Sequence, residues 1–481
     1  MIKKLHKAGI SGKFATTISS FIHDRKQNTK INQTYSTTRS TANGLPQGGV
    51  ISLICFLLYM NDVVTVVEHS TPSLFVDDLS LITHAKRPSA LCSKIQTDLD
   101  KIEKWSTINQ MVFAPSKFHI INISLDNKKL TRKHKDSITY NNQKLHWSHA
   151  EKLLGVTFDA NLNFLPHLLD TIQKVKDSRY LIWPHSDRVN GSNTRTLLDI
   201  FDSFIKPKIL YGASLWLFQA YPDIRLNVKP QRPYGEPLKN FHKLYNYLLS
   251  LCAGTKQCTS YLAILVRLGR FPLHYLIAFY AMKDFHSIVH DYTCPEMKRL
   301  LLHSIADTKK WNSTIFFKHA HDNISYFNNY TNDGNLLNIP SKTIFHRNLR
   351  DAMFKELTTY WSNSNEGRTT FHITPTWTTQ HFNRNNTRAH ESFYIRLSFT
   401  QNDTRSSQHT INNNIDPICQ RCKTHLDTPQ HLLLECKTLR LERNKMMNQI
   451  THHFPNIPPT LQNLLTSIPL QPFVLSFIKR I

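Results

Sequence analysis

Residues 73–82 read SLFVDDLSLI, and this stretch constrains the fold more than any other because it places two adjacent aspartates between two apolar arms. Two short apolar arms around a tight polar turn predict a β-hairpin, in which aspartate is a favoured turn residue. Neighbouring side chains of a regular strand point to opposite faces, so only a turn brings Asp77 and Asp78 to one edge. There they either serve the turn itself or share a divalent cation, which would suit phosphoryl transfer.

A glycine-rich loop precedes the hairpin. Residues 44–49 read GLPQGG and lead directly into an apolar segment with the pattern of a helix. Glycine lets the backbone approach a flat or charged ligand closely, and a helix start offers free N–H donors. By itself the loop would be an ordinary helix entry. Together with the two aspartates further along the chain, it is a specific signal.

The chain carries a large excess of positive charge. Its 59 Lys and Arg residues exceed its 34 Asp and Glu residues, which gives a net charge of +25 before any of the 26 histidines is counted. Such a charge attracts phosphate polyanions because binding releases their counterions. Nucleic acid is therefore the favoured partner. An anionic membrane surface is the weaker alternative, since no strongly basic amphipathic helix stands out.

Cysteine usage and hydropathy bear on the compartment. Eight cysteines in 481 residues are too few for a disulfide scaffold, and no secretory signal opens the chain. We therefore expect an intracellular protein of the nucleus, the cytoplasm or both, and not a secreted one. The longest apolar stretch, residues 260–282, is interrupted by Arg267, Arg270 and Pro272. It predicts a helix pair in a core rather than a membrane span, so we expect no membrane partner.

Hydrophobic spacing predicts a mixture of helices and strands. In chain order we expect an amphipathic helix or a helix pair over 1–23 with a break marked by Gly9 and Gly12, strand-prone residues 30–42, a helix over 89–108, strands and turns over about 111–160, and mostly helices from about 166 to 300. The first helix pair should share one apolar stripe, formed by Ile2, Leu5, Phe14, Ile18 and Ile22. Residues 310–345 have little periodicity and predict a connector.

Near its end the chain has the spacing C-x2-C-x8-H-x4-C, formed by Cys419, Cys422, His431 and Cys436. Three thiolates and one imidazole suit a closed tetrahedral Zn²⁺ site, and a C-x-x-C turn makes the usual first clamp. Chance clustering is the alternative, and His425 is a competing ligand. Four protein ligands leave no open position, so such a site would hold a fold and grip nucleic acid rather than catalyse a reaction.

The loop and hairpin together resemble a known family. GLPQGGVISLICFLLYMNDV followed by LFVDDLSL is similar to the central palm motifs of reverse transcriptases, and closest to those of non-LTR (LINE-type) retrotransposons. The similarity continues with DLDKIEKWSTINQMVFAPSKFHII, a further palm element, and with EKLLGVTFDANLNFLPHL and FIKPKILYGASLW, which resemble the thumb. HLLLEC resembles the zinc-knuckle-like motif at the end of such proteins, which favours His431 over His425 as the ligand.

The resemblance implies an α+β fold. It would comprise a partial right-hand polymerase palm, built from an antiparallel sheet with helices, a mostly helical thumb and a small zinc-knuckle-like tail. The implied domains are a partial palm over 1–130, the end of the palm and the helical thumb over 131–300, a variable helical connector over 301–400 and a C-terminal zinc-binding tail over 401–481.

The resemblance also implies roles for individual residues. Asp77 and Asp78 would hold Mg²⁺ (or Mn²⁺) and act in catalysis. Lys117 would neutralise or protonate the leaving pyrophosphate, although a solvated turn lysine is as plausible. The residues expected against the template base and the incoming nucleotide are Gly44, Pro46, Gln47, Gly48 and Phe75.

Three of the implied positions depart from the family pattern. Phe75 stands where the family usually has tyrosine, which keeps the ring and loses the hydroxyl. Gly49 stands in place of serine, and Leu53 in place of proline. The last two changes bear on where the helix after the loop begins.

The implied activity is that of an RNA-directed DNA polymerase, which copies RNA into DNA by two-metal nucleotidyl transfer. Its partners would be an RNA template, a DNA primer or target, and deoxynucleoside triphosphates. A catalytically inactive nucleic-acid-binding remnant is the alternative. The family carries a further metal-binding aspartate and a fingers domain upstream of a helix that resembles IKKLHKAGISGKF, where this chain starts. Asp24 follows that helix and does not map onto the aspartate, so we expect an N-terminally truncated element that extends a primer negligibly by itself.

Overall fold

The computed structural model describes residues 1–41, 44–123, 138–216, 235–255, 259–290, 341–380, 382, 386–399 and 402–481. The chain divides into two compact units: unit 1 comprises Met1–Leu153 with Asp159–Leu162, and unit 2 comprises Leu154–Phe158 with Asn163–Ile481. Helices and small sheets occur together, which confirms the α+β class. Most of the connector predicted over 310–345 lies outside the described residues.

Unit 1 opens with the predicted helix pair, α1 (Ile2–Lys7) and α2 (Gly12–Ile22). Buried Leu5 and Ile18 form a cluster with Cys55 of the third helix, and Ile2 and Ile22 pack against its edge. The predicted stripe is wrong at Phe14, whose side chain is 60% exposed. A stripe read from helical spacing assumes a single straight helix, and the break at Gly9 turns the second helix relative to the first.

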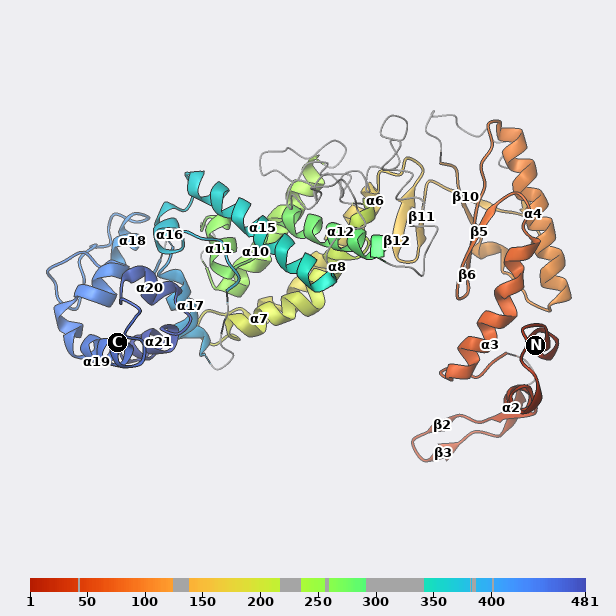
Figure 1. Cartoon of the computed structure of the whole chain (residues 1–481), viewed down its shortest axis with the longest axis horizontal. Coiled ribbons are helices and arrows are strands. Elements are labelled where there is room, and N and C mark those ends of the chain that lie inside the picture. The colour runs from red at the N-terminus through yellow and green to blue at the C-terminus, as the bar shows by residue number, and fades with distance from the viewer. Residues whose placement is uncertain are drawn as a thin grey trace. The chain divides into compact units, whose positions relative to one another are not determined.

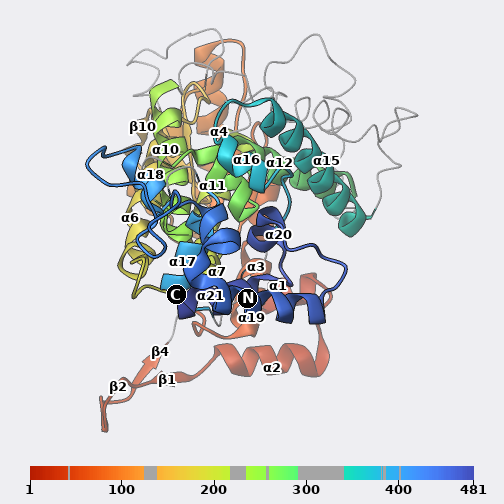
Figure 2. The ribbon, with the colours of Figure 1, turned by 90° about the vertical axis from the view of Figure 1, so that its left-hand side faces the viewer.

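A narrow arm of short strands follows α2. β1 (Arg25–Gln27) pairs antiparallel with β4 (Arg39–Thr41), and β2 (Lys30–Ile31) pairs antiparallel with β3 (Thr34–Tyr35). Figure 2 shows this arm extending away from α2. The strand-prone segment predicted here is therefore confirmed, and its polar, mostly exposed residues fit a ladder in contact with solvent.

The centre of unit 1 is a hairpin packed on helices. Its elements are α3 (Val50–Met60), the 3-10 helix η1 (Asn61–Val66), β5 (Thr71–Phe75), β6 (Asp78–Ile82) and α4 (Pro88–Ile108). α4 is the helix predicted over 89–108, and it buries its apolar stripe at Leu99, Ile102 and Trp105. Figure 1 shows α4 (orange) in the same unit as the hairpin.

The 3-10 helix η2 (Pro115–Lys117) and five short strands complete unit 1. The strands are β7 (His119–Ile121), β8 (Thr139–Tyr140), β9 (Gln143–Lys144), β10 (His146–Ser148) and β11 (Ala150–Leu153). β7 pairs with β10 in parallel, and β8 pairs with β9 antiparallel. Every sheet that the structure describes has two strands. The strands predicted over about 111–160 are thus present, but as separate pairs rather than as one broad sheet.

Unit 2 is mostly helical, as predicted for the residues after about 166. Its elements are β12 (Val156–Asp159, at the boundary), α6 (Leu165–Asp177), η3 (Ser178–Leu181), η4 (Trp183–His185), α7 (Thr194–Ile200), the π-helix η5 (Phe201–Ile205), α8 (Lys206–Leu210), α9 (Ala213–Trp216), α10 (Gly235–Ala253), α11 (Tyr261–Leu268), α12 (Leu273–His290), α15 (Lys342–Asn363), α16 (Arg368–Ile373), α17 (Arg388–Arg396), α18 (Arg405–His409), the π-helix η8 (His431–Glu435), η9 (Lys437–Leu439), α19 (Arg440–His453), α20 (Leu461–Thr466) and α21 (Gln471–Arg480).

The apolar stretch 260–282 forms the predicted helix pair α11 and α12. The break falls at Gly269, whose left-handed backbone (φ +60°) ends α11, and at Pro272 just before α12. Leu262, Leu265 and Met282 are buried in unit 2. Within the described residues, no single helix is long and apolar enough to cross a membrane; these two pass such a test only as a pair, bent by 45°.

Candidate functional sites

The two aspartates lie at the tip of the predicted hairpin. β5 and β6 pair antiparallel with Leu74 opposite Leu79 and Phe75 opposite Asp78, which leaves Val76 and Asp77 as a two-residue turn. Val76 has φ +56°, a conformation that β-branched residues rarely adopt. Such strain is concentrated at functional sites, where the surrounding structure enforces it.

The two faces of the hairpin differ in burial because side chains alternate along a strand. Leu74 and Leu79 point inward and pack against the cluster of Met60, Val63 and Trp105. Phe75, Asp77 and Asp78 are exposed, Phe75 to 60%. The hairpin therefore presents both carboxylates and an aromatic ring to solvent. These groups follow directly after the partly buried Leu74–Leu79 pair.

The GLPQGG loop ends where α3 begins. Gly44 and Gly48 have φ values of +80° and +88°, which only glycine adopts readily. Arg25 clamps the loop by donating a hydrogen bond from Nη2 to the carbonyl oxygen of Gly44 at 2.6 Å. Gln47 and Gly48 are exposed, and Gly49 caps the helix. The loop thus offers backbone and the Gln47 amide to a ligand, while Pro46 is half-buried.

Asp98 supports the hairpin, and the sequence patterns above did not identify it. Asp98 of α4 is fully buried and accepts hydrogen bonds from the backbone N–H groups of Glu68 (2.8 Å) and Ser70 (2.8 Å) and from the Ser70 hydroxyl (2.6 Å). The sequence does indicate that Asp98 is buried, because it lies on the apolar stripe of α4, three residues after Ile95 and four before Ile102. A carboxylate on a buried stripe requires partners.

The pKa of Asp98 reflects these contacts. Burial alone raises the pKa of a carboxyl group, but the hydrogen bonds from the Ser70 side chain and from the backbone of Glu68, His69 and Ser70 outweigh burial. The pKa therefore lies below the ordinary value of 3.8, and Asp98 is a carboxylate at neutral pH. It fixes the residues that lead into β5.

A second set of contacts ties the N-terminus of unit 1 to the same region. Lys4 pairs with Asp62 at 2.8 Å, and its Nζ lies 4.4 Å from the ring centroid of Tyr59 and 4.8 Å from that of Trp105. Trp105 Nε1 donates to Asp62 Oδ1 at 3.1 Å. Helix α1 is thereby held against the end of α3 and against α4.

Lys117 stands apart from the hairpin in its contacts. It is exposed in the 3-10 turn η2, which occupies the position of the predicted turn. Within the described residues, no hydrogen bond or ion pair joins Lys117 to Asp77 or Asp78. Its predicted role remains a prediction.

In the tail, the four predicted zinc ligands converge. The ligand atoms of Cys419, Cys422, His431 and Cys436 all lie within 4.8 Å of one another. Three of these residues are buried and Cys422 is half-buried. His425 is not part of this cluster, although its ring stacks on that of His431 with centroids 5.5 Å apart.

Local backbone bonds bring the ligands together. The N–H of Lys423, at φ +57°, donates to the carbonyl oxygen of Cys419 at 2.7 Å, which closes the C-x-x-C turn. The N–H of Cys436 donates to the carbonyl oxygen of His431 at 2.8 Å and ends the π-helix η8. Four ligands that are spread over eighteen residues of the chain are thus brought into one compact site.

The chemistry of the cluster fits zinc. Cys422 Sγ lies 3.3 Å from His431 Nε2, and a hydrogen bond from the Thr424 hydroxyl at 3.3 Å is the largest of the effects that lower the pKa of the Cys422 thiol to about 5. Burial raises the pKa of Cys419. Ligand atoms of a tetrahedral site with Zn–S bonds of about 2.3 Å lie roughly 3.8 Å apart, which these side chains can reach with small adjustments.

Comparison with known proteins agrees with the hairpin and the loop. Residues 1–158 match the reverse transcriptase (RNA-dependent DNA polymerase) family. This segment contains the GLPQGG loop, both aspartates and Lys117, so the predicted resemblance is confirmed at the level of the family.

The similar curated proteins are mobile-element polymerases of Drosophila melanogaster. The RNA-directed DNA polymerase from mobile element jockey is 23% identical over 210 residues, and the probable RNA-directed DNA polymerase from transposon BS is 23% identical over 226 residues. The matched regions cover 41% and 45% of this chain but only 22% and 24% of those proteins. The chain therefore matches less than a quarter of the length of each of these proteins.

Proposed function

We propose that this chain is part of the RNA-directed DNA polymerase of a non-LTR retrotransposon and copies RNA into DNA. The observation that carries the proposal is the hairpin tip, where Asp77 and Asp78 stand exposed at a strained two-residue turn. This tip lies in the segment that matches reverse transcriptases. Metal-bridging carboxylates at such an exposed edge suit nucleotidyl transfer.

The carboxylates fit Mg²⁺ or Mn²⁺. Magnesium prefers one or two carboxylates and retains several waters. Asp77 and Asp78 are open to solvent, and neither forms an ion pair within the described residues. Bound metal ions would stabilise the charge that develops on the attacking and leaving oxygens. Asp77 and Asp78 would hold these ions, and the left-handed Val76 turn fixes where the two side chains stand relative to the strands.

The neighbouring residues would position the substrates. We assign the exposed Gln47 and Gly48, with Gly44 and Pro46, to the contact with the template base and nucleotide, and exposed Phe75 to a stacking contact beside Asp78. Positioning is a large part of phosphoryl-transfer catalysis. Lys117 would neutralise the leaving pyrophosphate.

The domain assignment follows the same proposal. We assign residues 1–130 to a partial palm, 131–300 to the end of the palm and the thumb, 301–400 to a connector and 401–481 to the zinc-binding tail. In the tail, Cys419, Cys422, His431 and Cys436 would hold Zn²⁺ in a closed structural site. An RNA template, a DNA primer or target and deoxynucleoside triphosphates are the proposed partners, met in the nucleus or the cytoplasm.

The test compares the wild-type chain with Asp77→Asn and with the matched control Asp100→Asn, an exposed aspartate of the same unit. Two quantities are measured: Mn²⁺ binding by electron paramagnetic resonance, and extension of a primed RNA template by the chain joined to the upstream segment of a related element. Asp77→Asn should lose the bound Mn²⁺ and reduce extension roughly a thousandfold or more, because metal charge supplies several kcal/mol in such sites.

The control should behave like the wild type in both assays. Equal Mn²⁺ binding and equal extension by Asp77→Asn would contradict the proposal. Nucleic-acid binding by the wild type without Mn²⁺ binding or extension would favour the inactive nucleic-acid-binding remnant instead.

A further inference from the structure

Arg267 of α11 is a buried cation without a carboxylate partner. Arg267 is 3% exposed, and its Nε is a buried atom that has no hydrogen-bond partner. No ion pair joins Arg267 to an acidic residue anywhere in the part of the chain that the structure describes. Its guanidinium lies over the ring of Tyr394, 5.2 Å from the centroid.

This arrangement differs from that of partly buried Arg270 and buried Arg388 in unit 2. Arg270 forms two hydrogen bonds to the Asp202 carboxylate at 2.9 and 2.8 Å. Arg388 donates to the carbonyl oxygens of Cys252 and Leu251, each at 2.7 Å. Burial of a charge is costly unless it is paired and hydrogen-bonded. Arg267 therefore lacks the compensation that the fold supplies to its neighbours.

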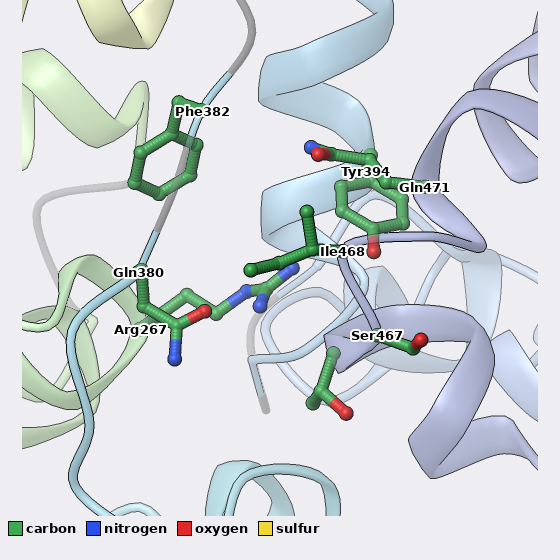
Figure 3. Close-up of a pocket in the computed structure, with 8 residues that line it drawn as sticks. Arg267, Gln380, Phe382, Tyr394, Ser467, Ile468 and Gln471 are labelled. Atoms are coloured by element: carbon green, nitrogen blue, oxygen red, sulfur yellow. The ribbon is translucent and has the colours of Figure 1, made fainter.

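The guanidinium of Arg267 points into a pocket (Figure 3). The pocket lies between α11, α17 and the α20–α21 turn, and its other lining residues are Gln380, Phe382, Tyr394, Thr466, Ser467, Ile468 and Gln471. The polar groups among them are amides and hydroxyls, which can donate hydrogen bonds. No carboxylate lines the pocket, so its electrostatic character is positive.

A helix N-terminus adds to this character. Gln471 is the first residue of α21, a ten-residue helix, and its side chain is largely buried. The N-terminal end of a helix carries a partial positive charge that stabilises anions. The Tyr394 hydroxyl donates to the carbonyl oxygen of Leu464 at 3.1 Å and accepts a hydrogen bond from the Arg267 side chain. The Nε of Arg267 is then the buried donor that has no partner.

We propose that this pocket is an anion site and that Arg267 binds an oxygen of a phosphate group there. The cavity volume is about 10 Å³, room for a single water-sized atom. One phosphate oxygen therefore reaches Arg267, while the rest of the group stays outside the cavity. The phosphate is either free inorganic phosphate or a backbone phosphate of a bound nucleic acid. The site is independent of the polymerase chemistry proposed for Asp77 and Asp78.

The test measures thermal unfolding of the full chain in rising inorganic phosphate, at constant ionic strength set with chloride. The variants are Arg267→Met, which keeps much of the side-chain volume without charge, and the control Arg195→Met, a partly exposed arginine of α7. Phosphate stabilises many proteins weakly by exclusion from their surface, and the control reveals that slope. Wild type and Arg195→Met should show an additional, saturable rise of the melting temperature, and Arg267→Met should not.

A second measurement does not depend on the folding of a variant. Inorganic phosphate should show line broadening in ³¹P NMR with the wild-type chain, and a single-stranded oligonucleotide that abolishes the broadening would identify backbone phosphate as the ligand. Persistence of the broadening would identify free phosphate. The proposal fails if phosphate shows no broadening and no saturable stabilisation, since a water then occupies the pocket. It also fails if Arg267→Met responds as the wild type does.

Discussion

The Asp98 carboxylate holds Ser70 by two hydrogen bonds, one from the backbone N–H at 2.8 Å and one from the side-chain hydroxyl at 2.6 Å. Ser70 directly precedes β5, and Asp98 lies in the middle of α4. A helix buried in the unit thereby fixes the start of the strand that leads to Asp77. Because register along an antiparallel pair is set from such anchors, the position of the hairpin tip depends on a residue distant from it in the sequence.

Replacing Asp98 should destabilise unit 1. In Asp98→Ala, the N–H groups of Glu68 and Ser70 and the Ser70 hydroxyl lose a charged acceptor inside the protein, which should cost about 3 kcal/mol in the free energy of unfolding. The control Asp100→Ala, exposed on the same helix, should change that free energy by about 0.5 kcal/mol or less. Urea unfolding followed by circular dichroism measures both, and equal values for the two variants would show that Asp98 is not an anchor.

The same contact should make unit 1 sensitive to acid. The pKa of Asp98 is lowered in the folded state, so its stabilising contribution is fully present above the unfolded pKa of about 3.9 and is lost as the pH falls through the lower folded pKa. The free energy of unfolding should therefore fall below about pH 4. Asp98→Asn, which cannot ionise, should remove this part of the pH dependence. An unchanged acid profile in Asp98→Asn would rule out Asp98 as its source.

The tail should depend on zinc. The 481-residue chain should bind one equivalent of Zn²⁺, and a chelator should reduce the helical signal of the tail because metal binding contributes directly to folding. Cys419→Ser removes one of the clustered ligands and should lower both zinc content and tail stability, whereas Cys92→Ser, outside the cluster, should retain the zinc. Zinc content by atomic absorption and circular dichroism give the measurements. Identical spectra before and after chelation would count against a structural metal.

Binding to nucleic acid should be strongly salt-dependent. The net charge of +25 predicts that several phosphates are neutralised on binding, so the affinity for RNA and DNA should fall steeply between low and physiological salt. Fluorescence anisotropy with a labelled strand at a series of salt concentrations gives the slope. A flat dependence would mean that the positive charge does not face the phosphate backbone.

Local sequence patterns determined much of this protein. The apolar arms around Asp77 and Asp78 predicted the hairpin, and the GLPQGG loop followed by an apolar segment predicted the helix that is α3, because turn chemistry and helix entry depend on residues that are adjacent in the chain. The cysteine spacing predicted a cluster that local backbone bonds then close. The resemblance to reverse transcriptases followed from the same short motifs, which lie within the matched residues 1–158.

The tertiary structure alone decided which of these residues are buried and what they contact. It exposed Phe14 against the helical stripe, separated the strands after Met111 into two-stranded pairs, and buried Asp98 with Ser70 as its partner. It also placed Arg267 in a pocket with Gln471, more than two hundred residues further along the chain. Burial and electrostatic pairing depend on contacts between segments that are distant in sequence, and no periodicity along the chain records which segments will meet.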